Sequence, residues 1–376
     1  MRLRAVVSFG TLIVVGLTSC GGNGGATFSQ NPPPPQSAEY LYGSHLADIV
    51  VTEKIDSTTG ALGTGTSTPG TNGVGITANP AATFIYGTDG STTAIDGFSI
   101  GSSGAISVLA GSPFLVHGSG GVNGIAIDSS GKFLYATSNN GTGIISGYSI
   151  DSSGALTAVP NSPFAAGATP LQIAVDPVGA FLYVSDAGGG MLAYSITSSS
   201  GTLTPISLGS VNGGSQGIAI RPDGKFLYAI DISSLVYAYS IAADGTLTAV
   251  SGSPFTVDVG SGTATRQVIV DPKGKFLYTY NTVGAPSTIS AFAIDSTSGS
   301  ITPVSGSPFN TSEVAYFAAS LAIEPSGKFL YASCASGNCG ILGFNIDATT
   351  GALSPILGSP FDSFVTIGTM AIVSIQ

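Results

Sequence analysis

Residues 123–136 read NGIAIDSSGKFLYA, and near copies of this stretch decide the fold. An apolar run, Ile125-Ala126-Ile127, is followed by a turn and then by the aromatic-rich run Phe133-Leu134-Tyr135. Asp and Gly favour turns, because Asp hydrogen-bonds its own backbone and Gly adopts positive φ without strain. The stretch therefore predicts two short strands joined by a tight turn.

The aromatic run recurs seven times, at intervals of 44 to 53 residues. The copies are Tyr40-Leu41-Tyr42, Phe84-Ile85-Tyr86, Phe133-Leu134-Tyr135, Phe181-Leu182-Tyr183, Phe226-Leu227-Tyr228, Phe276-Leu277-Tyr278 and Phe329-Leu330-Tyr331. A repeat of roughly 40–50 residues with several strands per unit is typical of β-propeller blades. The sequence predicts an all-β, seven-bladed propeller with four antiparallel strands in each blade.

The two ends of the chain predict how the ring closes. The repeat region begins on a second strand, EYLYGS at 39–44, and ends on a first strand, TMAIVSIQ at 369–376. We expect the C-terminal strand to pair with the stretch around Tyr40–Tyr42 and to complete blade one, which leaves no free sheet edge at the seam. Five units end in Ser-Pro-Phe, and we expect the proline to stop strand pairing at the outer edge. These motifs end at Phe114, Phe164, Phe255, Phe309 and Phe361.

The N-terminal residues 1–19 predict a secretory signal, with two arginines followed by an apolar run. Leu17-Thr18-Ser19-Cys20 resembles a bacterial lipobox, which implies cleavage before Cys20, lipidation of its thiol and a place in the cell envelope. Gly21, which is not Asp, favours the outer membrane by the same resemblance. The alternative is an ordinary signal peptide with an incidental cysteine. Residues 20–38 predict a Gly/Pro-rich linker, and 39–376 the propeller.

The net charge of −10, which becomes −12 without Arg2 and Arg4, limits the partners. An acidic chain without a basic stripe argues against nucleic acid and against anionic lipid head groups. We therefore expect membrane attachment through the Cys20 lipid only. We also expect a monomer and no cofactor.

The repeated units of the pattern IAIDPxGKFLYVSD resemble the seven-bladed β-propeller lactonase family and its YVTN-repeat relatives. The resemblance covers residues 39–376. It implies the propeller fold and, because some members are 6-phosphogluconolactonases, a lactone hydrolase with its site at one mouth of the central channel.

Three residues after each repeat tyrosine, the chain carries a polar or sulfur-bearing side chain. These are His45, Asp89, Ser138, Asp186, Asp231, Asn281 and Cys334. One interpretation is a polar collar at the mouth that binds a cation through its three Asp oxygens. The interpretation we favour is turn formation, because Asp and Asn fold loops locally. No metal site is predicted.

A second set of candidates lies in the segments that lead into the first strands: His117, Asn123, Gln172, Gln216, Arg266, Gln267 and Glu313. A lactonase needs a general base, or a bound water, and a cation for the developing oxyanion. His45, His117, Arg266 and Glu313 are the candidate catalytic residues. The candidate ligand-binding residues are Asn123, Gln172, Gln216, Gln267, Asp89, Asp186 and Asp231. The alternative is that these are scattered surface residues.

Cys334 and Cys339, in SCASGNCG, are close enough in sequence to predict a disulfide in an oxidising envelope. Two free thiols or a soft-metal pair are the alternatives.

Two functions follow from the sequence. The surplus of Ser, Thr, Asn and Gly in the loops, with few His, Arg and Glu, favours an envelope-anchored scaffold that binds a protein or a glycan. The alternative, a hydrolase that opens a sugar lactone, rests on the family resemblance. A cytosolic sugar-phosphate lactone also lies in a different compartment from a lipoprotein, so the sequence favours the scaffold.

Overall fold

The computed structural model describes residues 37–45, 48–70, 75–89, 92–116, 121–139, 142–188, 190–209, 211, 213, 216–231, 233–257, 264–282, 287–311, 320–333, 340–361 and 367–375. For residues 45, 264, 266, 282 and 367 it describes the backbone only. The chain from Ser37 to Gln376 forms one compact unit. Among the described residues there is no helix with the length and hydropathy needed to cross a bilayer.

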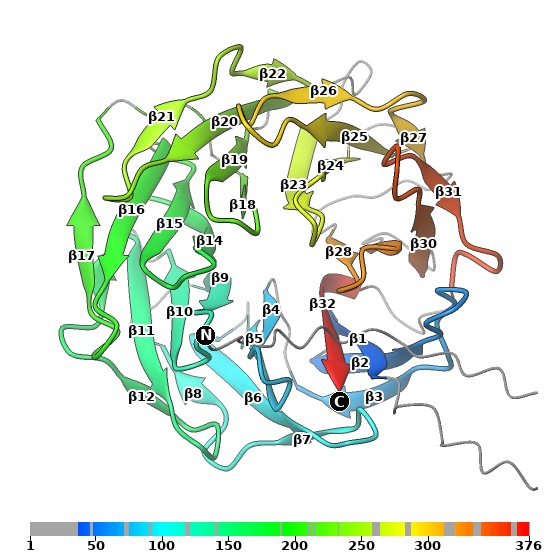
Figure 1. Ribbon diagram of the computed structural model, residues 1–376. Coiled ribbons are helices and arrows are strands. Elements are labelled where there is room, and N and C mark those ends of the chain that lie inside the picture. Colours follow the sequence, from blue (N-terminus) through cyan, green and yellow to red (C-terminus); the bar gives the residue numbers. More distant parts are fainter. Residues whose placement is uncertain are drawn as a thin grey trace, which may run out of the picture. The chain divides into compact units, whose positions relative to one another are not determined.

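Seven antiparallel sheets are arranged as blades around a common centre (Figure 1). Blade one contains β1 (Ala38–His45), β2 (Ile49–Ile55), β3 (Thr66–Pro69) and β32 (Ile367–Ile375). Blade two contains β4 (Ile76–Ala78), β5 (Phe84–Asp89), β6 (Ala94–Ile100), β7 (Ile106–Val108) and β8 (Phe114–Leu115). Blade three contains β9 (Val122–Ile127), β10 (Phe133–Ser138), β11 (Ile144–Ile150), β12 (Leu156–Ala158) and β13 (Phe164–Ala165). The seven-bladed propeller predicted from the sequence is confirmed.

The other four blades repeat this order. Blade four contains β14 (Pro170–Val175), β15 (Phe181–Asp186), β16 (Gly190–Ile196) and β17 (Leu203–Ile206). Blade five contains β18 (Gly217–Ile220), β19 (Phe226–Ile230), β20 (Leu235–Ile241), β21 (Leu247–Ala249) and β22 (Phe255–Thr256). Blade six contains β23 (Ala264–Val270), β24 (Phe276–Thr282), β25 (Thr288–Ile294), β26 (Ile301–Pro303) and β27 (Phe309–Asn310). Blade seven contains β28 (Leu321–Ile323), β29 (Phe329–Ser333), β30 (Ile341–Ile346) and β31 (Leu353–Pro355).

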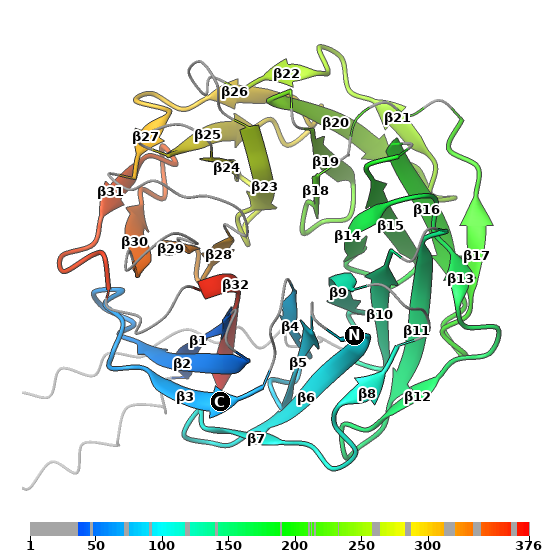
Figure 2. The ribbon, with the colours of Figure 1, turned by 180° about the vertical axis from the view of Figure 1, so that it is seen from behind.

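The ring closes as predicted, by pairing of the two ends of the propeller. Strand β32 lies beside β1 in an antiparallel ladder, with Leu41 opposite Ile372 and Tyr42 opposite Ala371. Blade one thus takes three strands from the start of the propeller and one from its end. Seen from behind, the first strand of every blade lies innermost (Figure 2). The ring therefore has no unpaired inner edge at the seam.

The hydrophobic core consists of seven clusters, each between two neighbouring blades. In the cluster between blades seven and one, Leu41 and Ile55 pack with Phe329 and Tyr331. Second-strand residues alternate between the two faces of a blade, so one run of Phe-Leu-Tyr supplies two clusters. This is why apolar residues occupy both faces of these strands.

The third residue of each aromatic run joins its blade to the next. All seven tyrosines are fully buried, and each hydroxyl donates a hydrogen bond to the carbonyl of a glycine in the next blade's third-to-fourth-strand turn. The pairs are Tyr42–Gly104, Tyr86–Gly154, Tyr135–Gly201, Tyr183–Gly245, Tyr228–Gly299, Tyr278–Gly351 and Tyr331–Gly60, at 2.7 to 3.0 Å. The pair Tyr331–Gly60 continues the pattern across the seam.

The prediction that proline ends strand pairing at the outer edge is wrong. In blade two the ladder between β6 and β7 stops after Val108, but Phe114 pairs again with Ile95. Between them, the hydroxyl oxygen of Ser112 accepts the amide hydrogen of Gly97 at 3.0 Å. The serine thus replaces one rung of the ladder, and blades three, five and six resume pairing in the same way.

Candidate functional site

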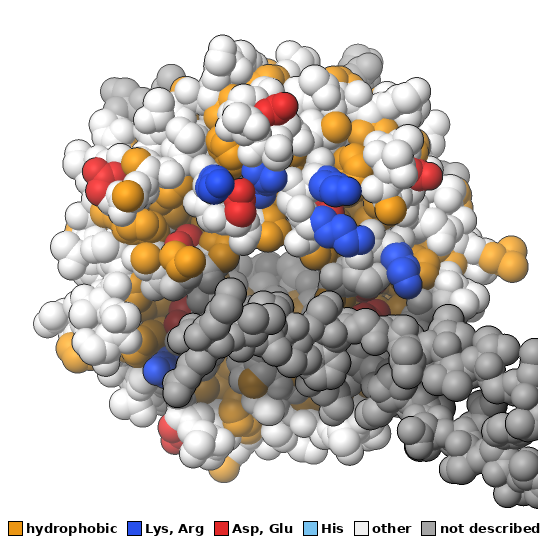
Figure 3. Space-filling view, viewed as in Figure 1, with side chains coloured by type: hydrophobic (Ala, Val, Ile, Leu, Met, Phe, Trp, Pro, Cys, Tyr) orange, Lys and Arg blue, Asp and Glu red, His pale blue; other side chains and the backbone are white. Residues whose placement is uncertain are grey.

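The propeller has two ends with different chemistry. The turn mouth carries the turns between first and second strands, and it is the face seen in Figures 1 and 3. Lysine and arginine side chains gather on it above blades five to seven (Figure 3). The loop mouth is the opposite end, where the first strands begin.

Carboxylate and amide oxygens at the turn mouth stabilise the first-to-second-strand turns by accepting backbone hydrogen bonds. The Oδ1 atom of Asp128 accepts the amide hydrogens of Lys132 and Phe133, both at 2.8 Å. The residues that cap the equivalent turns are Asn79, Asp176, Asp271 and Glu324. These side chains are buried and committed to backbone amides, so they are not available to a ligand.

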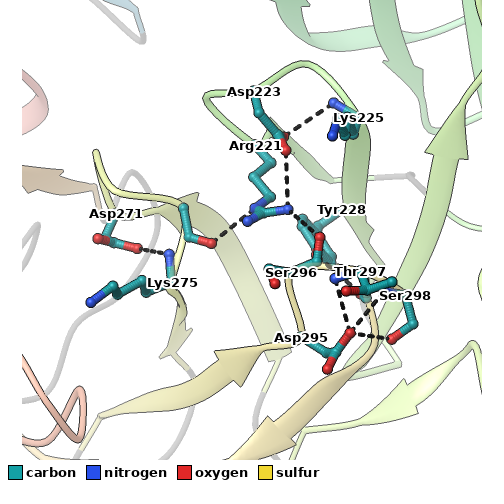
Figure 4. Close-up of polar contacts among 12 residues, drawn as sticks. Arg221, Asp223, Lys225, Tyr228, Asp271, Lys275, Asp295, Ser296, Thr297 and Ser298 are labelled. Atoms are coloured by element: carbon teal, nitrogen blue, oxygen red, sulfur yellow. Dashed lines mark hydrogen bonds and ion pairs between the residues drawn. The ribbon is translucent and has the colours of Figure 1, made fainter.

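Blade five departs from this pattern, because Arg221 stands where blades two, three, four, six and seven have an acid or amide. Its Nε donates to the carbonyl of Gly274 at 2.9 Å, and its Nη1 donates to the carbonyl of Ser296 at 3.1 Å (Figure 4). Asp223 lies 3.1 Å from the same Nη1. The guanidinium therefore joins blade five to two turns of blade six, which is a structural use of a buried cation.

The three collar aspartates at the loop mouth accept hydrogen bonds from the protein itself. Asp186 accepts the amide hydrogens of Ala168 at 3.1 Å and Thr169 at 2.7 Å. Those two residues lead into β14, so Asp186 ties the loop after β15 to the start of its own blade. Asp89 and Asp231 instead accept hydrogen bonds from residues that follow them in the chain. Among the described residues, no group of three His, Cys, Asp or Glu side chains is placed to hold a metal ion. The local contacts of Asp89 and Asp231 are those of turn formation, whereas Asp186 joins two segments of blade four.

A cavity of about 150 Å³ lies among the first strands, near their loop-mouth ends. Its described walls are Gly75, Ile76, Asn123, Gly124, Ile125, Gln172, Ile173, Gln267, Ser320, Thr369 and Met370. The polar side chains are amides and hydroxyls from blades one, three, four, six and seven. The structure thus brings together three residues predicted from the sequence, Asn123, Gln172 and Gln267.

Hydroxyl groups fix the walls of this cavity. The oxygen of Thr137 accepts the amide hydrogen of Gly124 at 2.9 Å, and its hydroxyl donates to the carbonyl of Leu171 in the next blade, also at 2.9 Å. Ser333 makes the same bridge from Ser320 to Gly368, at 2.8 and 3.1 Å. Neighbouring first strands are therefore linked to one another, which holds the cavity side chains in place.

The amides of the cavity differ in what they leave unused. Asn123 donates from Nδ2 to the carbonyl of Pro170 at 2.9 Å, which leaves its oxygen as an acceptor. Gln267 accepts the amide hydrogen of Leu321, which leaves its Nε2 as a donor. Among the described residues, the side-chain amide of Gln172 makes no hydrogen bond. Both its NH₂ donor and its oxygen acceptor are therefore available to a ligand in the cavity.

The remaining predicted site residues lie elsewhere. Gln216 is outside the described cavity wall, and its backbone carbonyl accepts the Ser185 hydroxyl at 3.3 Å. Arg266 lies within β23 rather than in a loop, and His45 is the last residue of β1; only the backbone of these two is described. The candidates outside the described residues are His117, Glu313, Cys20, Cys334 and Cys339.

Two polar cavity residues, Ser320 and Thr369, are not among the candidates predicted from the sequence. Both stand directly before an apolar run of a first strand, Leu321-Ala322-Ile323 and Met370-Ala371-Ile372. Gln172 precedes Ile173-Ala174-Val175 in the same way. Aligning the seven first strands on their apolar runs would have found this ring position.

The loop mouth also carries negative charge where blades one and two meet. Burial raises the pKa of the Asp96 carboxyl to about 6, and the nearby carboxylates of Asp89 and Asp48 add to the effect. An anion that approaches this side of the mouth meets like charge.

Comparison with protein families identifies the fold group. A family model described as "Lactonase, 7-bladed beta-propeller" matches residues 47–213 and 88–361. The chain belongs to this lactonase family. The matched residues span the described cavity wall apart from Thr369 and Met370, so most of the cavity lies within the family's common region. Among curated proteins, none matches the chain.

Solved structures share the lactonase-family propeller fold at low identity. A candidate 6-phosphogluconolactonase from Bacteroides fragilis is 19% identical with a TM-score of 0.73, over 93% of this chain and 100% of that one. A second one, from Bacteroides uniformis, is 19% identical with a TM-score of 0.75, over 90% and 100%. The periplasmic gluconolactonase of Pseudomonas aeruginosa is 14% identical with a TM-score of 0.71, over 91% and 100%.

Proposed function

We propose that this lactonase-family propeller hydrolyses a sugar lactone at its loop mouth, with the substrate ring in the cavity between the first strands. The observation that carries the proposal is the cavity itself, in which amides and hydroxyls from five blades converge. Family membership and the lactonases among proteins of this fold add support.

The size of the cavity favours a small ligand over a glycan chain. Pockets for drug-sized ligands usually measure about 300–1,000 Å³. At about 150 Å³, the cavity suits one sugar ring. This argues for the lactonase over the glycan-binding scaffold favoured by the sequence.

The side-chain amides of the cavity can stabilise the negative charge that develops in the transition state. Attack of water on the lactone carbonyl creates an oxyanion, and a Gln amide is a suitable donor to it. The Nε2 groups of Gln172 and Gln267 are the donors that this proposal assigns to the oxyanion and to the substrate hydroxyls. The general base is proposed to be one of His45, His117 and Glu313.

Steady-state lactone hydrolysis tests the proposal. We expect the purified protein to open plain or phosphorylated sugar lactones faster than the uncatalysed rate, and Gln172→Ala to lower kcat/KM about 10- to 100-fold, because one donor to the oxyanion or substrate is lost. Gln216→Ala is the matched control, since Gln216 lies outside the described cavity wall, and it should change kcat/KM less than about 2-fold. No turnover of any lactone in the panel would return the protein to the binding-scaffold hypothesis.

We also propose that Cys20 anchors the protein in the bacterial cell envelope. The lipobox-like sequence supports this. Cys20→Ser in the full chain should move the protein from the membrane fraction to the soluble fraction of lysed cells, because a lipid chain supplies most of the membrane affinity. A wild-type protein found only in the soluble fraction would contradict the anchor.

A further inference from the structure

The cavity wall is uncharged throughout its described part. Of the eleven residues around it, none has an ionisable side chain. Its polar groups are both donors and acceptors: the oxygen of Asn123, the Nε2 of Gln267 and the whole amide of Gln172. A hydroxyl group both donates and accepts, so such a wall matches a polyhydroxylated ring.

Phosphate recognition needs a different set of groups. A phosphate ester carries close to two negative charges at neutral pH and is usually bound by Arg or Lys. Five lysines lie in first-to-second-strand turns at the other end of the propeller: Lys132, Lys225, Lys273, Lys275 and Lys328. The guanidinium of Arg221, also at that end, is committed to two carbonyls and to Asp223. These six cations therefore lie at the end of the propeller opposite the cavity.

Negative charge at the loop mouth also opposes an anionic substrate. The carboxylates of Asp48 and Asp89 both act on Asp96 there, and the protein as a whole carries a charge of −10. Desolvating a phosphate in an uncharged cavity costs free energy that no described group there offsets.

We infer that the cavity selects an uncharged, unphosphorylated sugar lactone, and that Gln172 determines this selectivity. The inference rests on the proposed function and names its substrate class. Gln172 has this role because its amide is the one cavity amide that makes no hydrogen bond among the described residues. Its side chain can therefore be replaced without removing a described structural hydrogen bond.

The test compares one lactone with and without a phosphate, using the full chain and two matched variants. The substrates are glucono-1,5-lactone and its 6-phosphate, and the readout is the ratio of their kcat/KM values. Wild type should favour the plain lactone at least 10-fold. Gln172→Arg should shift the ratio about 10- to 100-fold toward the phosphorylated lactone, as expected for one new charge-assisted hydrogen bond. Gln216→Arg adds the same charge outside the cavity wall and should shift it less than about 3-fold.

A binding measurement separates this inference from the proposed function. The ring compounds 1,5-anhydroglucitol and 1,5-anhydroglucitol 6-phosphate cannot be hydrolysed as lactones, and calorimetry measures their affinity directly. Tighter binding of 1,5-anhydroglucitol without any lactone turnover would support the neutral-ligand inference and overturn the lactonase proposal. Turnover that favours the phosphorylated lactone would overturn the inference and leave the lactonase standing. Absence of both binding and turnover would overturn both.

Discussion

Gly60→Ala should lower the free energy of unfolding by about 2 to 5 kcal/mol, because its Cβ would clash with buried side chains between blades seven and one and its backbone would be strained. Gly60 has φ +73°, and its carbonyl accepts the Tyr331 hydroxyl at 2.7 Å. A Cβ there would lie 2.5 Å from Cδ1 of Phe329 and 2.7 Å from Cδ1 of Ile356. Both side chains are buried, at 4% and 3% exposure, so neither can move aside freely.

Gly209→Ala is the control for backbone strain alone. Gly209 has φ +64°, and a Cβ built on it meets no atom within 4 Å. Placing alanine in this left-handed region costs about 1 to 2 kcal/mol. Denaturant unfolding of both variants gives the difference. Equal decreases in the free energy of unfolding would mean that the Phe329 ring moves aside without an energetic penalty and that the contact between blades seven and one is not tightly packed.

Glu53→Gln should stabilise the protein at pH 8 by up to about 3 kcal/mol and have little effect near pH 4. Glu53 lies opposite Leu41, at the register position that is aromatic in every other blade. The equivalent residues are Phe98, Tyr148, Tyr194, Tyr239, Phe292 and Phe344. Its side chain is 1% exposed, and Oε2 has no hydrogen-bond partner among the described residues.

The sign follows from the two states of the chain. Burial raises the pKa of the Glu53 carboxyl to about 7, whereas the unfolded chain ionises near the ordinary value of 4.5. Below the unfolded pKa both states are protonated, and the folded state has its full stability. As the pH rises toward the folded pKa, the unfolded state releases its proton first, so stability falls and then levels off above pH 7. Gln does not titrate and avoids this loss.

Unfolding curves at pH 4, 6 and 8 check the prediction, and Asp347→Asn is a control of opposite sign. Asp347 accepts the amide hydrogens of Thr349 at 2.9 Å and Thr350 at 2.8 Å, and these bonds lower its pKa. Asp347→Asn should therefore destabilise the protein at pH 8. A pH-independent effect of Glu53→Gln would mean that Glu53 is ionised and solvated in the folded protein.

Much of the fold follows from local sequence patterns. The spacing of the Phe-Leu-Tyr runs predicts seven blades, and the half repeat at 369–376 predicts the pairing of β32 with β1, because strands and turns depend on neighbouring residues. The residues of the candidate site are harder to predict from the sequence. Asn123, Gln172 and Gln267 could be selected from the sequence, but only the ring geometry adds Ser320 and Thr369 and separates Gln216 from them.

The sequence by itself determined the number of blades, the strands within each and the closure of the ring. Only the tertiary structure decided what the repeated tyrosine does, what the Ser-Pro-Phe motif does and which amides share a cavity. The tyrosine reaches a glycine 62 to 73 residues later, or, for Tyr331, 271 residues earlier. Glu53 likewise looks ordinary in sequence, and its position is unusual because six aromatic residues occupy that place in the other blades. Strand and turn patterns act over a few residues, whereas contacts between blades join distant parts of the chain, so their partners appear only when the ring is assembled.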